Sequence, residues 1–352
     1  MFLRKTKKKH KFILAGLFLS GLVGAGFGSG REIFVYFASF GVVGIVGFIL
    51  ACVTLWFAAS QILEIAIGRH FTGVDQIVGF VVKGKRASFY TFSILLFAFI
   101  GYVAMLSGIR DVLRPVFPAV CNQFPILFGI CTCGIAVAFA LAVFYGNFAA
   151  YSRVCSIITP AVVLCVATVA VFAAFYAPGP SLAMSFSLRK IPVLLGKSIL
   201  YTGYNLLFLL GALGRAGSLS PPAREIRKGS LLGAGLFLSC GTCIFIALCI
   251  ISPAASGQGM PLLSVIGTFG NVPERIFSCV LAVAMLLCAA CNFGTVGSVA
   301  GKKSFAVPLI ALLGIPLSYI GFDRVISRIY PVFGVVGILF LLALAQLRRK
   351  IV

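Results

Sequence analysis

The hydrophobic positions of this chain form long continuous runs, separated by short groups of polar and charged residues. A run of about 20 apolar residues is long enough to cross a bilayer as a helix. The runs do not alternate with polar positions as barrel strands do. The pattern therefore predicts an all-α polytopic membrane protein with ten spans, near residues 12–37, 41–67, 88–116, 124–147, 153–177, 191–214, 229–252, 273–299, 304–321 and 326–347.

The first span carries glycines at four alternate positions, from Gly24 to Gly30. Each glycine costs a helix interior about 1 kcal/mol relative to alanine. The segment therefore predicts an unwound turn with free backbone groups at membrane depth, which is tolerated only where protein or a cavity surrounds it. Close helix packing is the alternative, because Gly24/Gly28 and Gly26/Gly30 are both G-x-x-x-G pairs. These two pairs lie on opposite faces, so one packing partner does not explain both.

The sixth span is also interrupted, by the polar stretch from Tyr201 to Asn205. Interrupted segments at corresponding positions of two halves are typical of a transporter binding site. We therefore predict a five-plus-five inverted repeat in which helices one and six are broken.

Composition and charge agree with a membrane location. Hydrophobic residues make up 61% of the chain and charged residues 10%, and the net charge is +22. Most basic residues fall on one side if both termini are cytoplasmic, which is the positive-inside pattern. Nucleic-acid binding is therefore not needed to explain the charge. We expect a single membrane domain over residues 12–347 between cytoplasmic tails at 1–11 and 348–352, located in the cell membrane of a bacterium, with no cleaved leader.

Two motifs carry a resemblance to a known family. The run from Gly24 to Glu32, G-A-G-F-G-S-G-R-E, resembles the G-A-G-F-A-S-G-Q-E signature of the YkvI-like bacterial membrane proteins. Tyr201, Tyr204 and Asn205 resemble an element of that family's sixth span. The family is similar to the amino acid–polyamine–organocation transporters, which implies the leucine-transporter-type fold. Arg31 stands where the family pattern has glutamine.

Broken helices would direct helix ends of opposite partial charge at one site near the membrane midplane. An amino acid or similar zwitterion suits such a site. Its carboxylate would take the amides of Gly24, Ala25 and Gly26, and aromatic side chains would close over it. The expected substrate-binding residues are Gly24, Ala25, Gly26, Phe27, Gly28, Ser29, Tyr102, Tyr201, Thr202, Gly203, Tyr204 and Asn205. The tyrosines could equally be packing residues.

Ionisable residues within spans are expensive and usually functional. In the resembled fold, Arg31 and Glu32 come close to Asp323 above the substrate, so we expect a gate there. A local ion cluster, with Asp323 pairing Arg324 or Arg328, is the alternative. A sodium site in that fold would add oxygen ligands from the eighth span, for which Asn292, Thr295 and Ser298 are candidates. Serine and threonine hydroxyls also simply bond their own helix backbone.

The remaining chemistry is sparse. Cys240/Cys243 and Cys288/Cys291 form C-x-x-C pairs inside spans, where packing is the better interpretation than metal or redox chemistry. We expect no enzyme activity, no metal site and no cofactor beyond a coupling Na⁺ or H⁺. The predicted function is secondary transport of an amino acid or similar small zwitterion across the lipid bilayer. A ligand-binding membrane sensor and a metal-ion transporter of the same fold are the alternatives.

Overall fold

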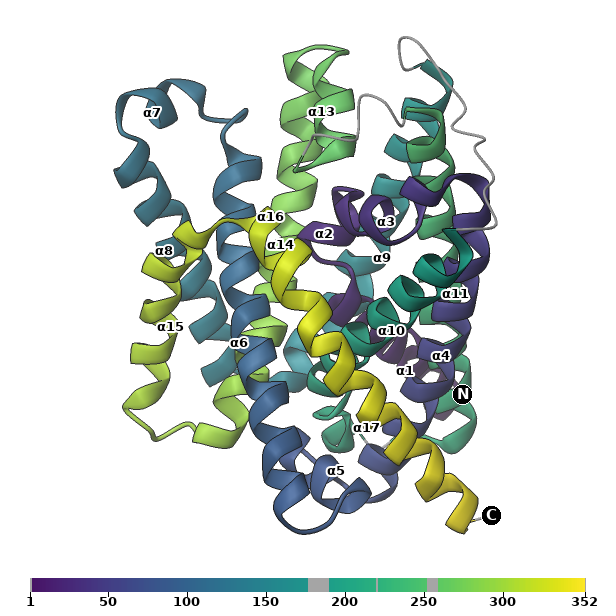
Figure 1. Cartoon of the computed structure of the whole chain (residues 1–352). Coiled ribbons are helices and arrows are strands. Elements are labelled where there is room, and N and C mark those ends of the chain that lie inside the picture. The colour runs from purple at the N-terminus through teal and green to yellow at the C-terminus, as the bar shows by residue number, and fades with distance from the viewer. Residues whose placement is uncertain (1, 177–189, 220, 252–258, 352) are drawn as a thin grey trace.

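The computed structural model describes residues 2–176, 190–219, 221–251 and 259–351, and this part is a bundle of helices (Figure 1). Eight of the helices described there are long and apolar enough to cross a membrane. Two shorter apolar helices, His10–Leu22 and Ala306–Ile320, lie within the segments predicted as the first and ninth spans, and the count of ten spans stays a prediction. The prediction of an all-α polytopic membrane protein is confirmed.

The helices follow the chain in two halves. The first half contains α1 (Phe2–Leu22), α2 (Ala25–Gly28), α3 (Arg31–Tyr36), the 3₁₀ helix η1 (Ala38–Val43), α4 (Gly44–Gly68), α5 (Val74–Val81), α6 (Lys85–Leu113), α7 (Pro118–Gln123), α8 (Pro125–Tyr145) and α9 (Phe148–Tyr176). The second half contains α10 (Ile191–Leu213), η3 (Ala216–Leu219), α11 (Ala223–Ile250), α13 (Pro261–Gly267), α14 (Asn271–Ala300), α15 (Ala306–Leu317), η4 (Ser318–Ile320), α16 (Phe322–Arg324), the π-helical turn η5 (Val325–Ile329) and α17 (Tyr330–Ile351).

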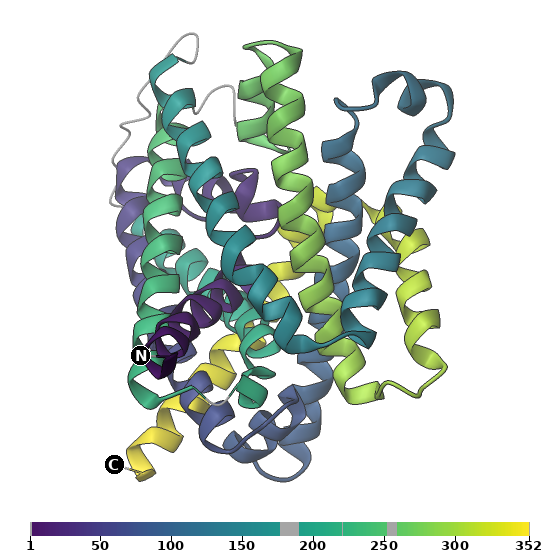
Figure 2. The same cartoon turned by 180° about the vertical axis from the view of Figure 1, so that it is seen from behind.

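Two groups of helices pack side by side. In one group, α10 and α11 each pack against both α1 and α4, so the first and sixth spans meet inside this group. In the other, α14 packs against α6 and α8, and α15 packs against α8. The helix α17 runs along α10, and α9 closes the back of the first group (Figures 1 and 2).

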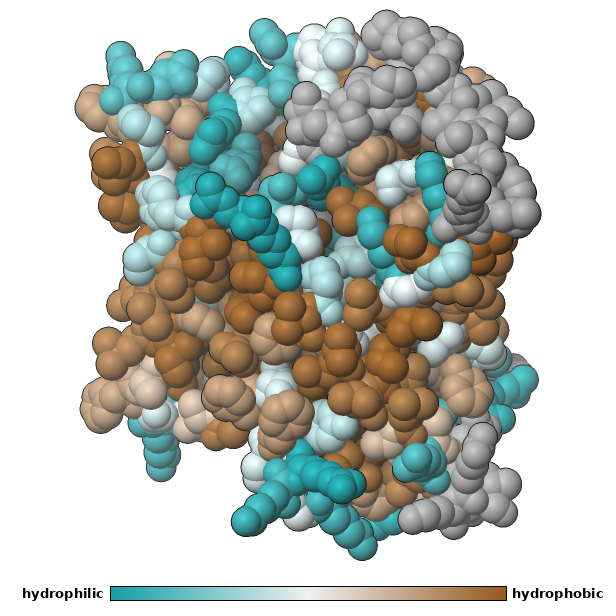
Figure 3. Space-filling view, viewed as in Figure 1, coloured by the Kyte–Doolittle hydropathy of each residue, from teal (hydrophilic) through white to brown (hydrophobic). Residues whose placement is uncertain are grey.

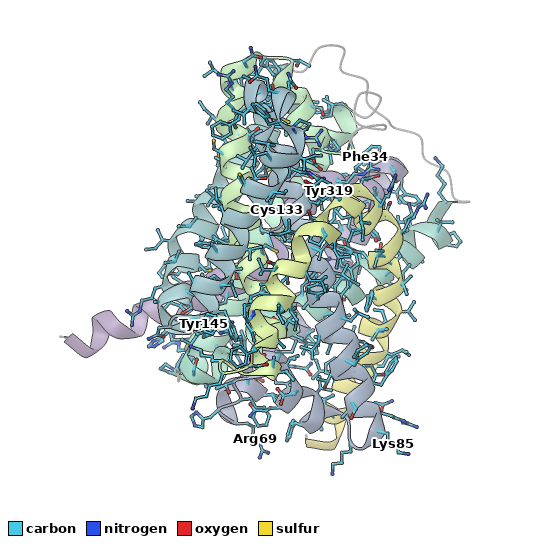
Figure 4. All side chains as sticks on the ribbon, turned by 90° about the vertical axis from the view of Figure 1, so that its left-hand side faces the viewer. Phe34, Arg69, Lys85, Cys133, Tyr145 and Tyr319 are labelled. Carbon is cyan, nitrogen blue, oxygen red and sulfur yellow. The ribbon has the colours of Figure 1, made fainter. Side chains whose placement is uncertain are left out.

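A broad hydrophobic belt crosses the middle of the face shown in Figure 3, and hydrophilic residues gather above and below it. Both chain ends lie in the lower half with α5, whereas α7 and α13 lie at the top (Figures 1 and 2). Arg69 and Lys85 mark the lower end in Figure 4, and Phe34 and Tyr319 lie toward the upper end. The two termini and the basic 68–87 connection therefore share one face. Which face meets the cytoplasm stays a prediction from the charges.

The predicted break in the first span is present. The helix α1 ends at Leu22, α3 begins at Arg31, and Gly30 between them has a φ of 81°. Such a backbone angle is favourable for glycine and unfavourable for other residues. The short helices α2 and α3 lie across the upper half of the bundle rather than along it (Figure 1).

The predicted break in the sixth span was wrong, because α10 is continuous from Ile191 to Leu213. Its polar side chains form hydrogen bonds with the backbone carbonyls of the helix and do not interrupt it. The Thr202 hydroxyl donates to the Ser198 carbonyl at 2.9 Å, and the Asn205 amide donates to the Tyr201 carbonyl at 3.0 Å. The single glycine of the stretch, Gly203, lets α10 approach the backbone of α17 at Gly334. One glycine destabilises a helix too little to interrupt it, whereas four alternate glycines in the first span destabilise it enough.

Candidate functional site

The site forms where the first span is interrupted. The Val23 amide donates to the Leu19 carbonyl at 2.7 Å as the last turn of α1, and the Gly24 amide then turns back to the Leu22 carbonyl at 3.0 Å. A methyl group added at Gly24 would lie 3.1 Å from both Cys288 Sγ and Met105 Sδ. The interruption is therefore enclosed by α6 and α14, and protein surrounds the irregular backbone as a membrane requires.

Glu32 lies at the centre of this region. It belongs to α3, it is 5% exposed, and its carboxyl group packs directly over the Cα atom of Gly26. No side chain fits at Gly26 while Glu32 keeps this position. From the sequence, we expected Gly26 to let the backbone approach a ligand. In the structure, Gly26 lets the backbone approach the carboxyl group of Glu32 in the same chain.

Four tyrosines surround Glu32, and we call them the tyrosine cluster: Tyr36, Tyr201, Tyr204 and Tyr330. The Tyr204 hydroxyl donates to Glu32 Oε2 at 3.0 Å. The ring of Tyr36 lies 5.5 Å from the rings of Tyr201 and Tyr204, and Tyr204 lies 5.1 Å from Tyr330. All four tyrosines are buried, with at most 2% of each residue exposed. Three spans, through α3, α10 and α17, therefore converge on one carboxylate.

The polar groups of the cluster are not mutually satisfied. The buried hydroxyls of Tyr36, Tyr201 and Tyr330 have no hydrogen-bond partner among the residues that the structure describes. Among the described residues, no lysine or arginine forms an ion pair with Glu32. Buried polar groups in proteins are nearly always hydrogen-bonded, and buried charges are nearly always paired. Glu32 and the tyrosine cluster, which lack these partners, are therefore a strong candidate for a binding site.

An ion pair lies next to the cluster. Arg31 Nε contacts Asp323 Oδ1 at 2.7 Å, and it joins α3 to α16 across 292 residues of sequence. The side chain of Arg31 is 14% exposed and that of Asp323 is 48% exposed, so the pair lies between the cluster and the solvent. The structure brings together the two residues expected to form a gate, rather than pairing Asp323 with a neighbour on its own helix.

Further contacts hold the break from above. The Leu262 amide of α13 donates to the Ser29 carbonyl at 3.0 Å. The Lys197 ammonium of α10 donates to the Val35 carbonyl at 2.8 Å, near the end of α3. A π-helical turn separates Asp323 from Tyr330, and such turns occur frequently at functional sites. The elements that hold Glu32 in place are therefore joined to both halves of the chain.

Several residues expected in the site lie elsewhere. The ring of Phe27 stacks on Phe237 at 4.4 Å, toward α11. The Tyr102 hydroxyl donates to the Ala311 carbonyl at 3.0 Å, between α6 and α15. Thr202, Gly203 and Asn205 serve α10 and its packing, as described above. Of the sixth-span residues predicted, Tyr201 and Tyr204 belong to the cluster. Of the first-span residues, Gly24, Gly26, Gly28 and Ser29 form the interruption itself.

The predicted ion-coupling residues bond within their own helix. The Thr295 hydroxyl donates to the Cys291 carbonyl at 3.1 Å, and the Ser298 hydroxyl donates to the Thr295 carbonyl at 2.7 Å. The Asn292 amide lies 3.6 Å from Cys288 Sγ. These contacts match the alternative in which the hydroxyls satisfy the backbone of α14. A sodium site at these residues stays a prediction.

Sequence reasoning missed Tyr36 and Tyr330. Tyr36 lies four residues after Glu32, and this spacing places both side chains on one face of a helix. Tyr330 follows Asp323 across a π-helical turn, so helical spacing from Asp323 does not predict its position. The sequence therefore held a signal for Tyr36, in its spacing from Glu32, and none for Tyr330.

The cysteines form no disulfide in the part of the chain that the structure describes. All twelve are free, and the Cys240 thiol contacts the Val163 carbonyl at 3.4 Å. No group of three His, Cys, Asp or Glu side chains that could hold a metal ion occurs among the described residues.

Comparison with known proteins gives one kind of match. No protein-family profile matches the chain, and no curated protein matches it either. Among solved structures, the chain is similar to a mutant of the manganese transporter of Eremococcus coleocola, with a TM-score of 0.50 and 13% sequence identity. The match covers 97% of this chain and 77% of the transporter chain. At this identity the likeness establishes the fold alone. The leucine-transporter-type fold is confirmed for this chain, and the YkvI-like family stays a prediction.

Proposed function

We propose that the protein is a secondary active transporter for a small solute that carries an amino group, with amino acids among the candidates. One observation carries the proposal: a buried carboxylate, with no cationic partner among the described residues, lies at the interruption of the first span. Ionisable groups at membrane depth mark substrate and ion pathways. An ammonium group on the solute would supply the positive charge that Glu32 needs as a partner.

Alternating access would open and close the path to this site. The Arg31–Asp323 pair closes the upper side of the cluster, and separating α3 from α16 would open it. The helices of the lower side, α1 and α10, pack together at the centre and would separate in the opposite step. With the predicted orientation, the upper side is extracellular, and the protein lies in the bacterial cell membrane with both termini in the cytoplasm.

Metal-ion transport is the second candidate, and one observation favours it. The sulfur atoms of Met105 and Cys288 flank Gly24, so thioether, thiol and carboxylate groups lie around one break. Such mixed ligands bind divalent transition metals. The manganese transporter with this fold points the same way. A sensor that binds the solute without moving it is the third reading of the same residues.

Uptake into proteoliposomes distinguishes these readings. The purified protein would be offered radiolabelled amino acids, radiolabelled ethanolamine and Mn²⁺, with and without sodium and pH gradients. The proposal expects saturable, gradient-driven uptake of a compound with an amino group. Uptake of Mn²⁺ alone would establish the metal transporter. Calorimetric binding of an amine without uptake in any gradient would establish the sensor.

A further inference from the structure

We infer that the group recognised at this site is a primary ammonium, with Glu32 as its counter-ion and the hydroxyls of the tyrosine cluster as hydrogen-bond acceptors, and that recognition does not need a carboxylate on the solute. The inference rests on the proposed function and adds the chemical class of the solute. It corrects the emphasis of the sequence, which pointed to a zwitterion held by free backbone amides.

The charge balance of the site points to a cation. The chain has seven acidic residues, and Glu32 is the buried one, since Glu64, Asp75, Asp111, Glu225, Glu274 and Asp323 are partly or fully exposed. A buried carboxylate is costly unless a proton or a cation compensates it. A second carboxylate brought by an amino acid would add repulsion in a region of low polarity. An amine without a carboxylate brings the required charge and no repulsion.

The surrounding groups distinguish between kinds of ammonium. Three hydroxyls of the cluster have no hydrogen-bond partner within the described part of the chain, and a hydroxyl oxygen accepts hydrogen bonds from N–H groups. A primary ammonium has three N–H donors, so it can bond to Glu32 and to two hydroxyls together. A quaternary ammonium has no donor and would leave all three hydroxyls unsatisfied. The aromatic rings attract either cation, so they contribute affinity without selecting between the two.

The backbone amides offer less than the sequence suggested. The Gly24 amide already donates to the Leu22 carbonyl, and the Glu32 carboxyl covers the Cα atom of Gly26. A solute carboxylate would have to displace this carboxyl group to reach the amides beneath it. The structure therefore disfavours the binding of a solute carboxylate to these backbone amides, which the sequence had predicted.

Three matched compounds test the inference in the purified, intact protein by calorimetry. Ethanolamine carries a primary ammonium, choline is its quaternary counterpart, and serine is ethanolamine with a carboxylate added. Mn²⁺ is the fourth probe. We expect ethanolamine to bind, and choline and serine to bind at least about tenfold more weakly, the factor that one hydrogen bond to a charged group represents.

Two variants and a control locate the binding. Glu32→Gln keeps the shape and the contact with Tyr204 but removes the charge, so ethanolamine affinity should fall at least about tenfold. Tyr201→Phe removes an unpartnered hydroxyl, so affinity should fall while the melting temperature of the ligand-free protein is maintained or rises. Tyr151→Phe is the control, because that hydroxyl donates to the Leu287 carbonyl at 2.9 Å outside the cluster. It should lower the melting temperature and leave affinity unchanged.

The outcomes separate this inference from the proposed function. Serine binding tighter than ethanolamine, or equal ethanolamine affinity in Glu32→Gln and the unmodified protein, would overturn the inference and leave a transporter of amino acids standing. Equal binding of choline and ethanolamine would overturn the role of the hydroxyls. Binding of Mn²⁺ with no response to any amine would overturn the inference in favour of the metal. Ethanolamine binding without uptake would support the inference and contradict transport.

Discussion

The contact between Gly26 and the carboxyl group of Glu32 lies at the centre of the proposed binding site. A glycine in a membrane helix often serves close packing of helices, and Gly203 against Gly334 is such a case here. Gly26 differs, because the group lying over it is a carboxylate rather than another backbone. The same residue type therefore has two roles in one molecule, and a substitution should distinguish them.

Replacing Gly26 by leucine should abolish solute binding and leave the protein folded. A branched side chain occupies the place of the Glu32 carboxyl group and turns it away from the tyrosine cluster. The expected loss of affinity is at least about tenfold, because the charged contact is lost. Calorimetry and melting temperature would be measured on the same preparation.

Gly196→Ala is the matched control for this variant, since Gly196 lies in α10 with no neighbouring atom in its way. It should maintain affinity and stabilise the helix by up to about 1 kcal/mol. A stable Gly26→Leu protein with unchanged affinity would show that Gly26 has no part in the binding site.

The dependence of binding on pH is also decided at the residue scale. Groups facing the site from its packed elements are Tyr36, Tyr201, Tyr204, Tyr330, Cys52 and Cys288, with Arg31 and Lys197 on the adjoining helices. Tyrosine and cysteine are neutral and lysine and arginine are charged between about pH 5 and pH 8 at their ordinary pKa values. Glu32 is the carboxylic acid of this set, so it is the group that becomes neutral as the pH falls.

Ethanolamine binding should weaken as the pH falls. Protonation removes the negative charge of Glu32, so protons and the ammonium compete for one carboxylate. For a single competing proton, the change cannot exceed about tenfold per pH unit. Calorimetric titrations at several pH values would measure it, and Glu32→Gln should show a flat profile. A steep profile in Glu32→Gln would assign the titration to another group.

At the scale of elements, the ion pair between α3 and α16 should hold the upper side closed. Ion pairs that are partly exposed to solvent contribute about 0.2–1 kcal/mol. Asp323→Asn should therefore raise the open population by up to about fivefold, the factor that 1 kcal/mol represents. The buried Cys288 would report opening, in a variant that retains it as the sole cysteine, through its rate of labelling by a membrane-impermeant thiol reagent.

The control for the ion pair is the exchange of its two charges. In the double variant Arg31→Asp with Asp323→Arg, the attraction is restored and labelling should return toward the original rate. Equal labelling in all three proteins would mean that the pair has no influence on opening.

The elements also explain how far the sequence could be read. Four alternate glycines correctly predicted the interruption of the first span, because their combined cost exceeds what a helix tolerates. The predicted break in the sixth span was wrong, because the polar side chains of Thr202 and Asn205 form hydrogen bonds with backbone carbonyls of the same helix. The contact of Arg31 with Asp323 was anticipated only through the resemblance to a known fold. The convergence of four tyrosines depends on how three spans pack, which local spacing does not determine.

At the scale of the whole molecule, the orientation in the membrane rests on the distribution of charge. The termini and α5 share one face, and α7 lies on the opposite one (Figure 1). A single cysteine introduced at Lys228 should resist an impermeant thiol reagent added to intact cells, and one at Asn122 should react, since basic loops face the cytoplasm. Reaction at Lys228 with protection at Asn122 would reverse the orientation.

The three scales meet at Glu32, because the interruption of the first span places this buried carboxylate inside the helix bundle, where we propose that it binds the solute. Uptake of radiolabelled ethanolamine into proteoliposomes, for the unmodified protein and Glu32→Gln at equal amounts of inserted protein, tests this most directly. The account predicts saturable uptake by the unmodified protein and background uptake by a Glu32→Gln protein with an unchanged melting temperature. Equal uptake by the two proteins would contradict it.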